Sequence, residues 1–134
     1  MRLGDLVSVD RSDREAAVES MHRAEEVMNR GLNMTLFPEG TRSRDGRLLP
    51  FKKGPFYLAM DSGIPIVPVT ILNSDRLMEK GSVLIRPGTV RLIFHPPISP
   101  ANFSDKEGLI QAVKEGIASA LPSALREANL NPSS

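Results

Sequence analysis

The chain opens with apolar residues that recur at helical spacing. Four of them lie three or four positions apart and so share one helix face: Ala17, Met21, Ala24 and Met28. Ahead of them, Ser12 and Glu15 have the spacing of a capping box, in which a hydroxyl precedes a glutamate by three residues. Gly31 supplies a stop signal behind them. The pattern predicts a helix over residues 13–30.

Short β-rich segments surround and follow this helix. Strands are expected at five places: residues 6–9, 33–37, 64–71, 82–86 and 89–94. Residues 33–37 are expected to form a buried strand, while the prolines of 64–71 require an edge position or a bulge. Pro87-Gly88 joins the last two strands as a hairpin or bend. A helix is expected over 54–60, because Pro55 suits its first turn and Gly63 follows its end.

The last predicted element is a helix over residues 106–121, with Ser104 and Glu107 as a second capping box. Strands alternating with helices predict an α/β fold, a mixed β-sheet flanked by helices. The length suits one domain, which we expect over residues 1–128, with a polar tail over 129–134.

Composition narrows the possible functions. The 134 residues are 40% hydrophobic and 25% charged, and 17 basic against 16 acidic residues leave a formal charge of +1, which gives no argument for a nucleic-acid partner. Without cysteine there is no disulfide, thiolate nucleophile or cysteine-bound zinc, and the two histidines, His22 and His95, do not suggest a metal cage. No apolar run approaches the ~20 residues that span a bilayer, so the chain alone is expected to be soluble and cytoplasmic.

The residues that carry chemistry lie where the predicted strand 33–37 stops and a loop begins. Gly40 lets the backbone approach a ligand, Thr41 and Ser43 offer hydroxyls, and Arg42 offers a planar fork of donors. This set suits a phosphate monoester, which takes several donors and a bidentate cation. Further positive charge comes from four nearby residues: Arg44, Arg47, Lys52 and Lys53. The alternative is a solvated turn in which Glu39 pairs with Arg42.

Arg11 is a second candidate for anion binding. It ends the predicted strand 6–9 and so can point at the same crevice as Arg42. The alternative is a surface arginine near the start of helix 13–30, where the helix dipole does not favour a cation.

The block Phe37-Pro38-Glu39-Gly40-Thr41-Arg42-Ser43 resembles the FPEGTRS block of the lysophosphatidate and glycerol-phosphate acyltransferase family. Two flanking segments are similar to blocks of that family in the same order, residues 4–11 before it and 64–69 after it. Lys52-Lys53-Gly54 fits the family pattern before a helix. The resemblance covers roughly residues 4–100.

The resemblance implies a truncated glycerol-phosphate acyltransferase domain that transfers a fatty acyl group to lysophosphatidate. Arg11 and Arg42 would hold the acceptor phosphate, and the substrate-binding set would be Arg11, Glu39, Gly40, Thr41, Arg42 and Ser43. No cofactor is implied, since acyl-CoA or acyl-carrier protein serves as co-substrate. The complete protein is expected on the cytoplasmic face of a membrane.

The sequence departs from the family at its catalytic motif, a histidine and an aspartate separated by four residues, in which the histidine takes the hydroxyl proton. The residue five after His22 is Val27, and the residue five after His95 is Pro100. No catalytic residue is therefore assigned. We expect a fragment of an ordinary acyltransferase, because losing a leading strand and helix would expose apolar surface and a sheet edge. The alternatives are a non-catalytic module that binds phospholipid head groups and an unrelated α/β domain whose loop only turns the chain.

Overall fold

The computed structural model describes residues 22–24, 26–41, 43, 45–77 and 86–130. The chain divides into two compact units, Met1–Leu36 and Phe37–Ser134. Predictions for the strand over 6–9 and for the capping box at Ser12 and Glu15 lie outside the described residues.

The first unit contains part of the predicted helix. Residues 22–24 and 26–29 are helical, and Gly31 follows with a φ of 77°, a left-handed conformation that suits glycine at a helix end. The prediction is confirmed where the structure describes it. The buried strand predicted over 33–37 is wrong: residues 32–37 form no strand, and Leu36 and Phe37 are 47% and 71% exposed. Local β-propensity does not make a strand unless a neighbouring strand accepts its backbone hydrogen bonds.

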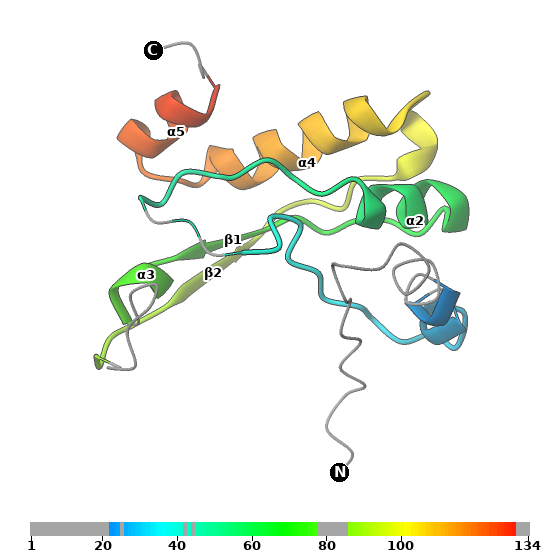
Figure 1. Cartoon of the computed structure of the whole chain (residues 1–134), viewed down its shortest axis with the longest axis horizontal. Coiled ribbons are helices and arrows are strands. Elements are labelled where there is room, and N and C mark those ends of the chain that lie inside the picture. The colour runs from blue at the N-terminus through cyan, green and yellow to red at the C-terminus, as the bar shows by residue number, and fades with distance from the viewer. Residues whose placement is uncertain (1–21, 25, 42, 44, 78–85, 131–134) are drawn as a thin grey trace. The chain divides into compact units, whose positions relative to one another are not determined.

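The second unit confirms the predicted α/β class. Its elements are α2 (Gly54–Ser62), β1 (Val69–Leu72), α3 (Ser74–Leu77), β2 (Arg91–Phe94), the 3-10 turn η1 (Pro100–Asn102), α4 (Lys106–Ser119) and α5 (Ser123–Leu130). Figure 1 shows α2 and α4 along one side of the β1–β2 ribbon, with α5 beyond the end of α4.

Local sequence explains the bounds of α2. A proline occupies its first turn, where a missing N–H costs nothing. Gly63 caps the other end at a φ of 69°, and its N–H donates to the carbonyl of Ala59 at 2.9 Å. The predicted helix is confirmed and runs two residues further, to Ser62.

The two strands pair antiparallel, from Val69 opposite Phe94 to Leu72 opposite Arg91. The prediction for 64–71 is thus confirmed only in its second half, with one isolated bridge between Ile66 and Ile98 before it. His95 N–H donates to Pro68 O, so Val67 alone lies opposite the pair Pro96-Pro97 before the bridge forms. This is a bulge, where prolines are tolerated because no ladder donor is needed.

The hairpin or bend predicted around Pro87-Gly88 falls only partly on described residues. Residues 86–90 form no strand, and the partner of β2 is β1. Residues 82–85 of the expected first arm lie outside the described part of the chain.

The final helical region begins at Lys106 as predicted, and it differs from its prediction in its cap and in its end. The cap of α4 is Asp105, whose carboxylate accepts from Gly108 N–H at 2.8 Å, so the capping box assigned to Ser104 and Glu107 is wrong. An aspartate is as good a cap as a serine, and it stands one residue closer to the helix. The helix ends at Ser119, and α5 continues to Leu130.

The core lies between α2 and α4. Phe56 and Ala59 of α2 pack with Leu109 and Val113 of α4, four residues apart on one helix face. Partly buried side chains from the loops, helices and bridge surround them: Phe51, Met60, Ile66, Ile98, Phe103, Ile110 and Ile117.

Thr70 ties the sheet to α4. Its side chain is fully buried, and its hydroxyl lies 2.7 Å from both the carbonyl of Ile117 and Nε2 of His95. The hydroxyl has one proton, which it donates to the carbonyl; it therefore accepts from Nε2–H of His95. Ile117 is among the last four residues of α4, whose carbonyls lack helical partners, so Thr70 satisfies a group that the helix leaves open.

Candidate functional site

The candidate site is the loop of residues 37–53, which leads into α2. It begins with a tight turn in which Gly40 N–H donates to Phe37 O at 3.0 Å, with Pro38 at the second position. Gly40 has a φ of 67°, which a side chain would strain. Lys52 N–H then donates to Pro38 O at 2.7 Å. The two ends of the loop are thus hydrogen-bonded to each other, and the polar block, residues 37–43, lies on this closed frame.

The Glu39 side chain links the two sides of this frame. Its Oε2 accepts a hydrogen bond from Leu49 N–H at 2.8 Å. Half-burial raises the pKa of the Glu39 carboxyl above its ordinary value, and the bond from Leu49 opposes that shift. The side chain therefore contributes to the shape of the loop. The ion pair with Arg42 considered from the sequence is not tested, because Arg42 lies outside the described residues.

Asp45 organises the tip of the loop. Its Oδ1 accepts from Ser43 Oγ at 3.0 Å and from Arg47 N–H at 3.1 Å, and its Oδ2 lies 3.4 Å from Arg47 Nε. These bonds, the Arg47 N–H first, lower the pKa of the Asp45 carboxyl. Sequence reasoning overlooked Asp45, although Asp-Gly at 45–46 is a turn signal. The Ser43 hydroxyl is held by Asp45, so its proton reaches a ligand only if that bond opens.

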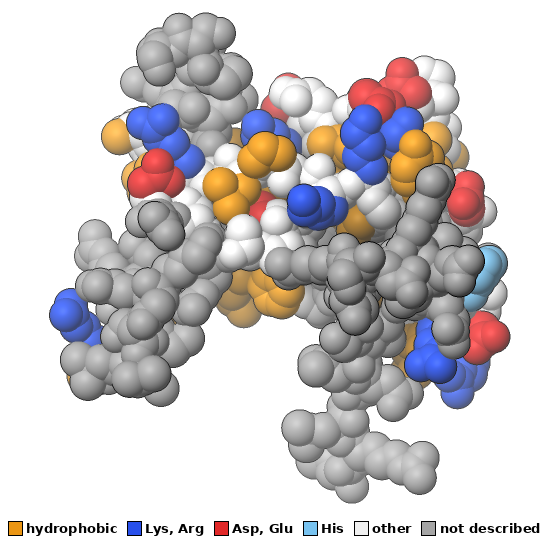
Figure 2. Space-filling view, viewed as in Figure 1, with side chains coloured by type: hydrophobic (Ala, Val, Ile, Leu, Met, Phe, Trp, Pro, Cys, Tyr) orange, Lys and Arg blue, Asp and Glu red, His pale blue; other side chains and the backbone are white. Residues whose placement is uncertain are grey.

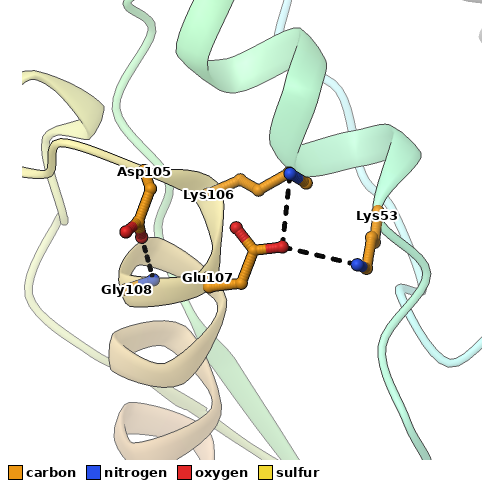
Figure 3. Close-up of polar contacts among 5 residues, drawn as sticks. All are labelled: Lys53, Asp105, Lys106, Glu107 and Gly108. Carbon is orange, nitrogen blue, oxygen red and sulfur yellow. Dashed lines mark hydrogen bonds and ion pairs between the residues drawn. The ribbon is translucent and has the colours of Figure 1, made fainter.

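Part of the positive charge expected around the loop is offset by ion pairs. Arg47 is paired with Asp45. Lys53 Nζ lies 3.4 Å from Oε1 of Glu107, which also meets Lys106 Nζ at 3.2 Å (Figure 3). Contact with Lys106 first, and with Lys53 after it, lowers the pKa of the Glu107 carboxyl. The cluster links the residue before α2 to the start of α4.

Four of the six predicted site residues come together in this loop: Glu39, Gly40, Thr41 and Ser43. Arg11 and Arg42 lie outside the described residues, as does Arg44, so the phosphate-binding roles stay predictions. Among the residues that the structure describes, no three His, Asp or Glu side chains gather in a way that could hold a metal ion.

The two histidines lie where the sequence suggested, one on a helix and one at a strand end. His22 is an exposed residue in the helical segment 22–24. His95 is half-buried and hydrogen-bonded to Thr70 at the end of β2. Neither is followed by an aspartate at the spacing of the expected catalytic pair.

Comparison with known proteins decides the family. The family model described as Acyltransferase matches residues 1–72, more than half of the chain and the whole polar block. The chain belongs to this acyltransferase family. The match runs across the division between Leu36 and Phe37, so both compact units contribute to it.

Relatives of this chain carry one recurring name. The chain is 45% identical over 98 residues to the 1-acyl-sn-glycerol-3-phosphate acyltransferase of Limnanthes douglasii, covering 72% of this chain and 35% of that one. It is 41% identical over 99 residues to the chloroplastic enzyme BAT2 of Brassica napus, covering 73% and 29%. The chain thus spans about a third of the length of the curated relatives it matches.

A solved structure resembles the chain in three dimensions. The 1-acyl-sn-glycerophosphate acyltransferase PlsC of Thermotoga maritima aligns with a TM-score of 0.71 and 38% identity, over 76% of this chain and 44% of that chain. Within the described residues of this family member, no helix is long and apolar enough to cross a membrane.

Proposed function

We propose that the protein takes part in acylating 1-acyl-sn-glycerol 3-phosphate, with the loop of residues 37–53 binding the acceptor. The acyltransferase family model matches residues 1–72, which include the Phe37–Ser43 block, and the relatives bear the name of that reaction; this match is the observation that carries the proposal. We further propose that residues 1–128 belong to one acyltransferase domain, with 129–134 as a polar tail.

In the proposed reaction, the free hydroxyl of the acceptor attacks the carbonyl carbon of an acyl thioester, either acyl-CoA or an acyl-carrier protein. A new C–O bond forms, the C–S bond breaks, and the hydroxyl proton is transferred through a general base to the leaving thiolate. No separate cofactor takes part. The acceptor carries a fatty chain, so the reaction takes place at a membrane surface, which we place at its cytoplasmic face.

The loop is suited to hold the phosphate. Hydrogen bonds from Leu49 to Glu39 and from Lys52 to Pro38 close the frame that carries Arg42 in the sequence. A closed frame loses less conformational entropy when it binds a ligand. Within the block, Thr41 is exposed and Gly40 has no side chain to shield the backbone. Arg42 and Arg11 are proposed to supply the guanidinium donors, and Ser43 a hydroxyl released from Asp45.

The first test measures the binding of glycerol 3-phosphate by titration calorimetry. Glycerol, which lacks the phosphate, is the control ligand. Arg42→Ala is expected to weaken binding by about tenfold or more, since a charge-assisted bond contributes about 1.5–3 kcal/mol. Arg91→Ala is the matched control, because Arg91 is an exposed arginine on β2 outside the loop. Equal affinity of the Arg42→Ala and unaltered chains would remove the assigned role.

A second candidate is a phospholipid head-group module without turnover, because the sequence contains no histidine followed five residues later by aspartate. Both candidates predict phosphate binding. The two candidates predict different products from lysophosphatidate and a radiolabelled acyl thioester. One sample contains the 134-residue chain alone, and a second contains the chain together with the histidine-bearing part of a relative. Labelled phosphatidate in the combined sample supports the enzyme, while binding without product in either sample supports the module.

A further inference from the structure

The far end of the 37–53 loop lies against helix α5. The side chain of Leu125, in the first turn of α5, approaches the backbone of Gly46 closely. Its Cδ1 is 3.1 Å, and its Cδ2 3.6 Å, from the position that a Cβ on Gly46 would take. Gly46 also has a φ of 77°, which a side chain would strain. Glycine therefore meets two requirements here, a left-handed turn and the close approach of a leucine. Figure 1 shows this end of the loop below α5.

This contact lies beneath an exposed, charged turn. Asp45 and Arg47 have 61% and 59% of their side chains open to solvent, whereas Gly46 and Leu125 are both half-buried. In Figure 2, basic and acidic side chains come to the surface in the region that α5 and the far end of the loop occupy in Figure 1. The backbone of the turn thus rests on an apolar side chain while its charged groups face water.

The position of Leu125 is set by the way α4 ends. Leu121 is buried, and its N–H donates to Ala118 O at 3.0 Å, so the chain leaves α4 on an anchored residue. Leu125 N–H then donates to Pro122 O at 3.0 Å in the first turn of α5. Because α4 packs on α2, and the loop leads into α2, the same packed helices support the base of the loop and, through α5, its far end.

The turn that Leu125 contacts holds one of the predicted ligand groups. Asp45 Oδ1 accepts from Ser43 Oγ at 3.0 Å and from Arg47 N–H at 3.1 Å. Both bonds require the backbone of residues 45–47 to keep its turn, and Gly46 is the middle residue of that turn. A turn released from α5 would lose more conformational entropy when the loop binds a ligand.

The alternative is that Leu125 only covers apolar surface at the corner between α4 and α5. Among the described residues, the apolar side chains packed on the core between α2 and α4 do not include Leu125, whereas the loop contact does. The acyltransferase family model ends at residue 72, so α5 lies outside the family match. The contact between α5 and the loop is thus a feature of the fold that the family pattern does not contain.

We propose that Leu125 of α5 is a positioning residue for the acceptor site. By packing on Gly46 it holds the turn of residues 45–47, and with it Ser43, in the arrangement that binds the phosphate of the acceptor. This inference rests on the proposed function of the loop and gives the last helix a part in it.

The test measures glycerol 3-phosphate binding to the 134-residue chain by titration calorimetry. Leu125→Ala removes the contact and keeps α5, because alanine favours a helix. It is expected to weaken binding by about fivefold, since a turn that is no longer held must be ordered by the ligand. Leu125→Met keeps an apolar side chain of similar volume and is expected to retain most of the affinity. Leu125→Val is expected to weaken binding by less than alanine, so the role is tested even without a folded alanine variant.

Leu72→Ala is the matched control. Leu72 is another half-buried leucine, it belongs to β1, and it lies outside both the loop and α5. Its replacement is expected to lower stability and to leave the affinity for glycerol 3-phosphate unchanged. Equal weakening of binding by Leu72→Ala and Leu125→Ala would attribute the effect to general destabilisation and overturn the proposal.

Amide hydrogen exchange, followed by nuclear magnetic resonance without ligand, gives a second readout. Leu125→Ala is expected to speed exchange at Arg47, whose N–H is bonded to Asp45 in the turn. Exchange at Lys52, whose N–H donates to Pro38 O at the base of the loop, is expected to change less. Equal acceleration at both amides, or none at Arg47, would overturn the proposal.

Failure of this role and failure of the proposed function are separable. If the unaltered chain binds glycerol 3-phosphate and Leu125→Ala binds it equally well, the role of Leu125 is overturned and the loop keeps its proposed function. If the unaltered chain does not bind glycerol 3-phosphate, the proposed function of the loop is overturned, and the role of Leu125 in it is overturned as well.

Discussion

Replacing Thr70 with valine tests whether a single hydroxyl holds the sheet against α4. Valine has nearly the same shape, so the change removes the hydrogen bonds to Ile117 O and from His95 Nε2, both 2.7 Å long, without opening a cavity. The site is fully buried, so water does not replace the lost partner. The fold is expected to survive with lower stability.

The magnitude follows from which groups are left unpaired. The carbonyl of Ile117 belongs to the last turn of α4 and has no helical donor, so it is left unsatisfied at a cost of about 1–3 kcal/mol. The ring of His95 is only half-buried and turns to water at little cost. We expect a loss of about 2 kcal/mol in the free energy of unfolding, the middle of that range.

The assay is urea unfolding followed by far-ultraviolet circular dichroism, with Thr70→Ser as the matched control. Serine keeps the hydroxyl and removes one methyl group, which costs about 1 kcal/mol. Valine is therefore expected to destabilise the protein more than serine. The reverse order, or equal losses, would show that packing of the methyl group and not the hydrogen bonds holds the contact.

Two further predictions concern the loop and the start of α4. Burial raises the pKa of the Glu39 carboxyl in the folded state. The contribution of this group to stability is therefore present at low pH. It is lost as the pH rises from the ordinary pKa of the carboxyl through the raised pKa. Glu39→Gln keeps an acceptor for Leu49 N–H and is expected to reduce this loss as the pH rises above 4.5, the ordinary pKa of the group. The measurement is the free energy of unfolding of both chains against pH, and an unchanged pH profile would contradict the prediction. Asp105→Ala is expected to cost about 1 kcal/mol by removing the cap of α4, while Ser104→Ala changes stability by less than about 0.5 kcal/mol. A larger effect of Ser104→Ala in thermal unfolding would restore the capping box predicted from the sequence.

Local signals in the sequence were sufficient for several features. Pro55 and Gly63 delimit α2 because each acts within one helical turn. The Phe37–Ser43 block, with the two flanking segments in the expected order, indicated the family, since specific residues in a fixed order carry that information. The same block indicated the loop, and the fold adds the hydrogen bond from Leu49 to Glu39, ten residues away, that closes it.

Other features depend on contacts between segments far apart, and only the tertiary structure decided them. The prediction that 33–37 forms a strand used β-propensity alone, whereas the ribbon forms between β1 and β2, whose facing residues Val69 and Phe94 are 25 positions apart. The bond between Thr70 and Ile117 spans 47 positions. Neither leaves a periodic trace in the sequence, because a strand or a buried hydroxyl is stabilised by whichever partner the fold brings to it. Local residues thus set where helices and turns begin and end in this acyltransferase family member, and long-range pairing set which strand exists and which polar groups are satisfied.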